Sequence, residues 1–128
     1  MQNVQAELTP AEWELMECLW RRKTARSGEL AQDMAQKTGW SRSTTLTLLR
    51  RLTDKGAVTA LPDGGANLYA PAIPREQAAR RETSSLIDRV YNGSLSLLVS
   101  SMTKKRDLPP EELAALREIL RGLEEEEK

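Results

Sequence analysis

The sequence predicts a mainly α-helical protein that carries one small β-hairpin. Three N-terminal segments place apolar residues at helical spacing, two short strand-like runs flank a Pro/Asp/Gly cluster at residues 62–66, and amphipathic segments follow. Three helices, the last two separated by a tight turn, and then a hairpin are the order of a winged helix-turn-helix. We expect this domain over residues 8–73 and a helical dimerisation region over residues 74–128.

The first two helices are predicted from their ends. Thr9 is the expected N-cap of a helix that begins at Pro10, and Glu12, three residues after the cap, completes a capping-box pattern. The second helix is expected to start from a cap at Ser27 and to end before Gly39, which suits a left-handed C-terminal cap.

The third helix is expected to run from a cap at Ser41 to about Lys55. Positions i, i+3, i+4 and i+7 mark its buried face, which consists of Thr45, Leu48, Leu49 and Leu52. The two strands of the hairpin are expected at residues 57–61 and 67–70, with a flexible tip between them.

Beyond the hairpin, two helices are expected. The first is a long amphipathic helix from Arg75 to about Met102, weakened around Asn92-Gly93, and the second begins at Pro110. The pair cannot bury its apolar stripes on itself, which favours symmetric self-association. Folding of both helices back over the N-terminal domain is the alternative. The expected dimerisation residues are Leu86, Ile87, Val90, Tyr91, Leu97, Leu98, Leu113, Leu116 and Leu120.

The composition excludes most catalytic chemistry. The 128 residues include no His and one Cys, so a Ser-His-Asp triad, a Cys-His dyad, a Cys/His zinc site and an intrachain disulfide are all impossible. No apolar run approaches the ~18 residues of a membrane span, and residues 1–7 lack the features of a secretory signal. We expect a cytoplasmic protein that is not an enzyme and has no cofactor, metal or membrane partner.

The net charge of zero hides a polarised distribution. Residues 37–55 hold five basic residues and one acidic residue, and residues 21–26 add four basic residues, whereas four glutamates stand at residues 124–127. The region of the third helix is therefore basic, and the far end of the chain is acidic.

The outward face of the third helix has the chemistry of a DNA-reading surface. Arginine binds guanine O6 and N7, threonine can contact a thymine methyl, and basic neighbours hold phosphates. A solvated helix face is the alternative for the same pattern. The expected DNA-binding residues are Ser41, Arg42, Ser43, Thr44, Leu46, Thr47, Arg50, Arg51 and Lys55.

A protein-interaction adaptor on a winged-helix scaffold, without specific DNA binding, is the alternative function. The zero net charge and a hairpin without Lys or Arg favour this alternative. An enzyme would need a Ser-Lys pair or paired carboxylates, and we find no such constellation in the sequence.

Several segments together resemble the BlaI/MecI family of penicillinase repressors. Residues 8–16 and Leu19-Trp20 resemble the opening helix of that family, and Tyr69 matches its second wing strand. The resemblance extends over about residues 8–123. The segments that resemble the recognition helix are Trp40-Ser41, Thr44, Thr47-Leu48-Leu49, Arg51-Leu52 and Lys55-Gly56.

The resemblance implies a homodimeric repressor on a palindromic operator, with the C-terminal helices as the dimer contact. It also implies a regulatory metalloprotease that cuts the dimerisation helix, at a bond that aligns with Ser101-Met102. This sequence departs from the family's Asn-Phe at both of these residues. It also has only Cys18 where the copper-responsive branch has a cysteine cluster, so copper sensing is not expected.

Overall fold

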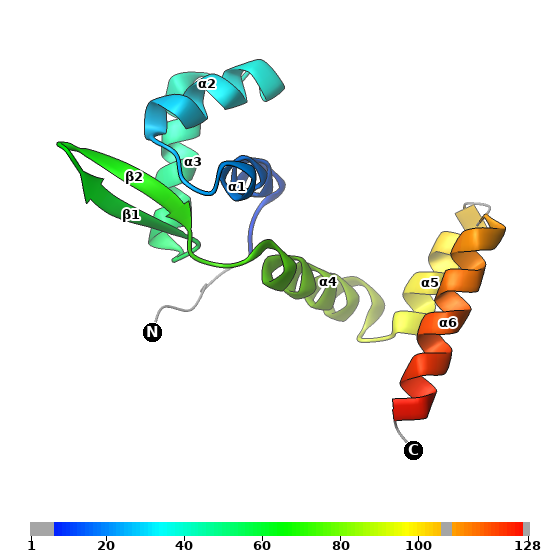
Figure 1. The fold of residues 1–128 in the computed structure, drawn as a ribbon. Helices are drawn as coiled ribbons and strands as arrows, with labels where there is room; N and C mark the ends of the chain where they lie inside the picture. The colour runs from blue at the N-terminus through cyan, green and yellow to red at the C-terminus, as the bar shows by residue number, and fades with distance from the viewer. Residues whose placement is uncertain (1–6, 106–108, 127–128) are drawn as a thin grey trace. The chain divides into compact units, whose positions relative to one another are not determined.

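The computed structural model describes residues 7–105 and 109–126, and it forms two compact units, Met1–Ser84 and Ser85–Lys128 (Figure 1). The mainly helical winged helix-turn-helix fold is confirmed, while the domain limits 8–73 and 74–128 stay a prediction. The elements are α1 (Pro10–Arg22), α2 (Ser27–Thr38), α3 (Arg42–Asp54), β1 (Val58–Asp63), β2 (Ala66–Pro71), α4 (Arg75–Tyr91), α5 (Leu95–Lys105) and α6 (Pro110–Glu126).

Helix α1 begins as its sequence predicts. Thr9 Oγ1 accepts the backbone N–H of Glu12 at 3.1 Å, and Glu12 Oε1 accepts the N–H of Thr9 at 2.8 Å. This reciprocal capping box satisfies two N–H groups that the first helical turn would otherwise leave without partners.

The cap of α2 differs from the predicted one. Ser27 is the first residue of the helix, and Arg26 is the N-cap. The reason is that the Glu29 side chain accepts the Arg26 backbone N–H at 2.8 Å, so the helix starts without a hydroxyl cap. At the other end Gly39 has φ 78° and donates its N–H to the Ala35 carbonyl at 3.0 Å, which confirms the left-handed cap.

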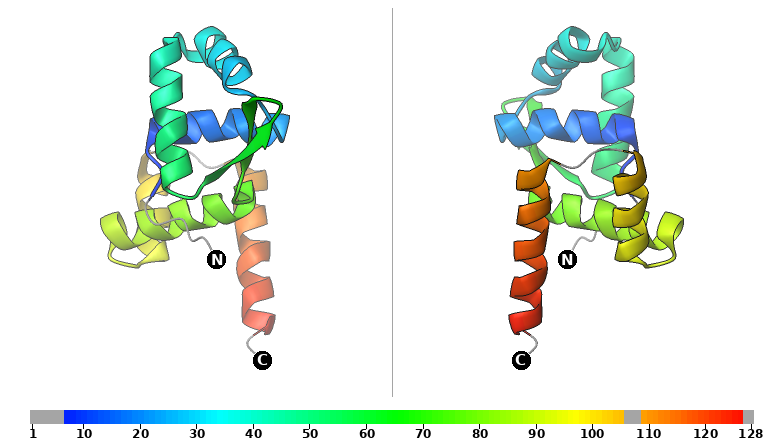
Figure 2. Two further views of the ribbon diagram at one scale, coloured as in Figure 1. Left: turned by 90° about the vertical axis from the view of Figure 1, so that its left-hand side faces the viewer. Right: turned by 90° about the vertical axis from the view of Figure 1, so that its right-hand side faces the viewer.

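The apolar side of helix α3 packs into the core and so sets the orientation of the helix. Ser41 caps it by accepting the N–H of Thr44 at 3.2 Å, and a short connection joins α2 to α3 (Figure 2). The predicted buried face is confirmed, because Thr45, Leu48, Leu49 and Leu52 are all buried. The three leucines belong to a hydrophobic core whose other members are Leu15, Met16, Cys18, Leu19, Ala25, Leu30, Met34, Ala57, Val58, Ile73 and Ala78.

The hairpin is tighter than its sequence predicts. The connection predicted at residues 62–66 is shorter in the structure, because strand pairing continues to Asp63 and Ala66. Only Gly64 and Gly65 form the turn, with φ 62° and 85°. Two successive positive φ angles define a two-residue hairpin turn that matches the twist of the strands, and glycine adopts both without strain.

The prediction of one helix from Arg75 to Met102 is also wrong. Asn92 and Gly93 both have positive φ, 52° and 81°, so the backbone leaves the helix after Tyr91. The N–H of Gly93 bonds the Ile87 carbonyl at 3.0 Å, and Ser94 Oγ then accepts the N–H of Leu97 at 3.2 Å. A left-handed cap closes α4 and a serine cap opens α5, so the break is a defined turn.

Helices α5 and α6 leave their apolar side chains in solvent. None of the side chains of residues 95–102 and 110–126 is buried. The exposed apolar residues of the second unit are Leu86, Val90, Leu95, Leu97, Val99, Met102, Leu113, Ile119, Leu120 and Leu123. Exposed apolar surface of this extent is uncommon on monomeric proteins.

The buried hydroxyl of Thr45 generates a stability prediction. Thr45 is 0% exposed, and its Oγ1 has no hydrogen-bond partner among the described residues. We expect Thr45→Val to raise the free energy of unfolding by about 1 kcal/mol, because it removes an unsatisfied polar group while keeping the branched shape. Urea denaturation measures the change. Thr47→Val is the control, since Thr47 is exposed on the same helix and should gain nothing; a loss of stability in Thr45→Val would contradict this explanation.

Candidate nucleic-acid interface

The side of α3 opposite its buried stripe carries polar and basic side chains. Ser43, Thr47, Arg50 and Arg51 are exposed, and Leu46 is partly covered. Because the apolar stripe holds the helix in one rotation, these side chains point outward together. The helix therefore presents hydroxyl, methyl and guanidinium groups on one surface, which are the groups that recognise base edges and phosphates.

Three hydroxyls gather at the first turn of α3. Ser41 Oγ lies 3.2 Å from Ser43 Oγ and donates to Thr44 Oγ1 at 3.0 Å, while it caps the helix. Arg42 is exposed beside them, and its Nη1 lies 3.9 Å from the position that a Cβ atom on Gly28 would take. The structure thus brings the first turns of α2 and α3 together at one basic and hydroxyl-rich place.

Lys55, the C-cap residue of α3, makes its side-chain contacts with the start of α1. Its ammonium donates to Glu12 Oε1 and, at 2.8 Å, to the Glu7 carbonyl. Glu12 is buried, with 1% of its side chain exposed. Lys55 therefore ties the end of α3 to the start of α1, a contact that local sequence patterns did not reveal because the partners are 43 residues apart.

Burial is the largest influence on the pKa of Glu12, and it opposes ionisation. The hydrogen bond from Lys55, the backbone hydrogen bond from Thr9 and the charge of Lys55 outweigh it together, so the pKa lies below its ordinary value. Glu12 is consequently a carboxylate in the folded protein at neutral pH, and its charge needs Lys55.

The wing, which is the β1–β2 hairpin, has no basic side chain of its own. Residues 58–71 contain one charged residue, Asp63, next to the turn. Arg26, the N-cap residue before α2, reaches it: Nη2 lies 2.6 Å from Asp63 Oδ2, and Nη1 donates to the Asp63 carbonyl at 3.3 Å. Sequence reasoning missed this pair, although Arg26 belongs to the basic run at residues 21–26.

The start of α2 is held against the wing by backbone pairing. Ala25 and Tyr69 form an antiparallel bridge with N–H to O distances of 2.9 and 2.8 Å. The connector before α2 thus acts as a short third strand beside β2, and it fixes the place from which Arg26 extends toward Asp63.

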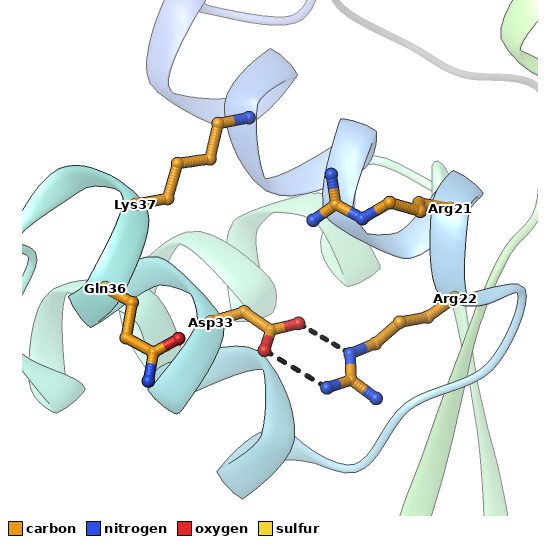
Figure 3. Close-up of a pocket in the computed structure, with 5 residues that line it drawn as sticks. All are labelled: Arg21, Arg22, Asp33, Gln36 and Lys37. Carbon is orange, nitrogen blue, oxygen red and sulfur yellow. Dashed lines mark hydrogen bonds and ion pairs between the residues drawn. The ribbon is translucent and has the colours of Figure 1, made fainter.

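A hollow of about 520 Å³ between α1 and α2 is polar (Figure 3). Arg22 donates to Asp33 twice, from Nε to Oδ2 at 2.5 Å and from Nη2 to Oδ1 at 3.1 Å, and these hydrogen bonds lower the Asp33 pKa to about 2. Burial and the adjacent Asp33 raise the pKa of Cys18 to about 11, so the thiol stays protonated and donates to Asp33 Oδ2 at 3.1 Å. Cys18 is therefore a core residue without the thiolate that redox chemistry needs.

Metal and membrane sites do not emerge from the described residues. No group of three or more Cys, Asp or Glu side chains in residues 7–105 and 109–126 is arranged to hold a metal ion. Among the described helices, none combines the length and apolar character needed to cross a bilayer.

The predicted dimerisation residues are spread over α4, α5 and α6. Five are exposed and four are partly covered, and Leu120 is 54% exposed. The exposed ones are Leu86, Val90, Leu97, Leu113 and Leu120, and the others are Ile87, Tyr91, Leu98 and Leu116.

The bond between Ser101 and Met102 lies inside α5. Ser101 is partly covered and Met102 is exposed. Tyr91 Oη lies 3.4 Å from Ser101 Oγ, a contact between the end of α4 and α5.

The Glu12–Lys55 pair generates a second prediction. We expect Lys55→Met to destabilise the fold by about 3 kcal/mol, because it leaves a buried carboxylate unpaired. Glu12→Gln/Lys55→Met should recover most of this loss. Since the folded pKa of Glu12 is lowered, its contribution is present above the ordinary pKa of 4.5 and is lost as the pH falls through the folded value. Denaturation at several pH values tests this; equal stability of both variants at neutral pH would contradict it.

Comparisons with known proteins agree with this geometry. The family model described as penicillinase repressor matches residues 8–122. The methicillin resistance regulatory protein MecI of Mammaliicoccus sciuri is 30% identical over 120 residues, which cover 94% of this chain and 98% of MecI. The penicillinase repressor of Bacillus licheniformis is 29% identical over 114 residues, 89% of each chain.

Two solved structures resemble part of the chain. The DNA-binding domain of the repressor BlaI is 28% identical, with a TM-score of 0.53, and the match covers 59% of this chain and 90% of that domain. Monomeric BlaI of Bacillus licheniformis in complex with the blaP half-operator is also 28% identical, with a TM-score of 0.52 and coverage of 59% and 92%.

Proposed function

The chain belongs to the penicillinase repressor family, and from this premise we propose that it represses transcription as a homodimer on a palindromic operator. That the chain is a DNA-binding repressor follows from the family and from the likeness to BlaI bound to its half-operator. Repressors of this family act by binding rather than by catalysis. The observation that carries the proposal is the single polar and basic face that α3 turns to solvent.

Helix α3 enters the major groove of DNA in this proposal. A helix of this width fits the major groove of B-DNA, where base pairs show distinct patterns of donors and acceptors. Ser43, Thr47 and Arg50 face the base edges, and Leu46 contacts a thymine methyl. Arg42 and Arg51, at the flanks of the face, bind phosphates, and Ser41 and Thr44 hold the first turn in shape.

The exposed stripes of α4, α5 and α6 supply the homodimer contact. An isologous interface joins the same surface of two chains, so one apolar stripe on each copy is sufficient. Two copies of α3 then read two inverted half-sites that are separated by one or more turns of DNA. Operator DNA and a second copy of the chain are thus the partners, and the cytoplasm is the compartment in which they meet.

Release of the repressor by a metalloprotease is the regulatory part of the proposal. A cut at Ser101-Met102 would divide α5 and separate the stripe of α4 and α5 from that of α6. Because the bond lies inside a helix, α5 must open locally before a protease can bind it in extended form.

The experiment for the DNA-binding proposal is a gel-shift titration with a duplex from the chain's own promoter region and with a scrambled duplex. We expect Arg51→Ala to weaken binding to both and to reduce the slope of log K against log salt by about 0.9, because one phosphate contact is lost. Arg121→Ala on α6 is the control and should bind as the unmodified chain does.

If micromolar unmodified protein shifts neither duplex, the repressor proposal is contradicted, and the alternative of a protein-interaction adaptor is favoured. A loss in Arg51→Ala that is confined to the promoter duplex would instead assign Arg51 to a base.

A substitution on α6 tests the dimer proposal. We expect Leu120→Asp to weaken dimerisation roughly 30-fold, the effect of removing an interface residue worth ~2 kcal/mol. Because Leu120 is 54% exposed in the single chain, the substitution should leave each chain folded. Sedimentation velocity measures the dimer. Ala114→Asp, on the other side of α6, is the matched control, and equal dimerisation of both variants would contradict the proposed interface.

A further inference from the structure

We propose that Arg26 binds a backbone phosphate of DNA beside α3, and that the wing-tip carboxylate of Asp63 competes with this phosphate for the guanidinium. The inference rests on the proposed DNA-binding function and assigns a phosphate contact outside the recognition helix. It also gives the single acidic residue of the wing a role in setting affinity.

The first support is the position of Arg26. It precedes α2, and two residues later Gly28 lies against the Arg42 guanidinium, whose Nη1 is 3.9 Å from the place of a Cβ atom on Gly28. Arg42 is the first residue of α3. Two arginines therefore lie at the first turn of α2, Arg26 as its N-cap and Arg42 beside Gly28.

The second support is that the wing needs a cation from elsewhere. A wing that approaches DNA meets the phosphate backbone, and basic side chains normally provide the attraction. Residues 58–71 contain no Lys or Arg, and Asp63 would repel phosphate. The Arg26 guanidinium at the wing tip is the cation in contact with Asp63, and the Ala25–Tyr69 bridge holds its backbone beside β2.

The third support is that the pair can open. Arg26 and Asp63 are 44% and 52% exposed, so water and ligands reach both side chains. Exposed ion pairs of this kind contribute little to stability. A phosphodiester carries the same single charge as a carboxylate and binds arginine through the same paired N–H groups. The high density of phosphates along DNA then allows one of them to replace Asp63.

A double-mutant cycle tests the proposal on a scrambled duplex over a range of salt concentrations. We expect Arg26→Gln to reduce the slope of log K against log salt by about 0.9, because one phosphate contact is lost. We expect Asp63→Asn to raise affinity about threefold, the effect of releasing one exposed ion pair. In the Arg26→Gln background, Asp63→Asn should change nothing further.

Glu76→Gln is the matched control for charge. It also removes one carboxylate from an exposed arginine, Arg80, but on α4. If it raises affinity as much as Asp63→Asn does, net charge alone explains the result and the proposal is wrong. All variants remove exposed groups, and thermal unfolding verifies that they fold.

Three further outcomes would overturn the proposal. The first is that Arg26→Gln leaves the slope of log K against log salt unchanged, and the second is that Asp63→Asn changes DNA affinity equally with and without Arg26. The third is that Asp63→Asn weakens DNA binding, because the ion pair would then serve to hold the wing in position. If the unmodified chain binds no duplex, the proposed function fails; if it binds and the cycle shows no coupling, only the role of Arg26 and Asp63 fails.

Discussion

The burial of one side of α3 is the constraint on which the rest of the structure depends. Leu48, Leu49 and Leu52 pack into the core formed with α1 and α2, and each fully buried leucine contributes about 2 kcal/mol. Because a helix is rigid, this packing also determines which side chains face outward. The sequence of α3 therefore encodes stability on one side and, in the proposed function, DNA recognition on the other, and a rotation of the helix would lose both.

Charges around this helix divide into structural and available ones. Lys55 is bound to the buried Glu12 and joins two helices, whereas Arg50 and Arg51 stand exposed on the outer face. Arg26 is intermediate, because its partner Asp63 is itself exposed. The basic residues hidden in a net charge of zero are therefore of three kinds: bound to a buried carboxylate, exposed, and paired with an exposed carboxylate. The contacts of each side chain distinguish these kinds.

Features encoded by neighbouring residues were predictable from the sequence. The capping box at Thr9, the left-handed cap at Gly39 and the buried stripe of α3 depend on spacings of a few residues. The break between α4 and α5 was only partly predictable. Asn92-Gly93 indicates a weakened helix in the sequence. The full turn that the structure has there also depends on the hydrogen bonds that close α4 and on the cap at Ser94.

Long-range pairs were not predictable. Arg26 and Asp63 are 37 residues apart, and the pair exists because the Ala25–Tyr69 bridge brings the start of α2 to the wing. Lys55 looked like one more member of a basic run, since nothing local points to Glu12. The hollow between α1 and α2 likewise needs both helices in place. Such contacts follow from the topology, so a local pattern cannot reveal them.

The central claim is that the outward face of α3 is the surface that binds DNA. The most direct test is a titration of the full chain, labelled with ¹⁵N, with a duplex from its own promoter region, followed by amide chemical shifts. The account predicts that the largest changes occur at residues 41–51, with a second group around Arg26 and the wing turn. Changes confined to α4, α5 and α6, with α3 unaffected at saturating duplex, would contradict it.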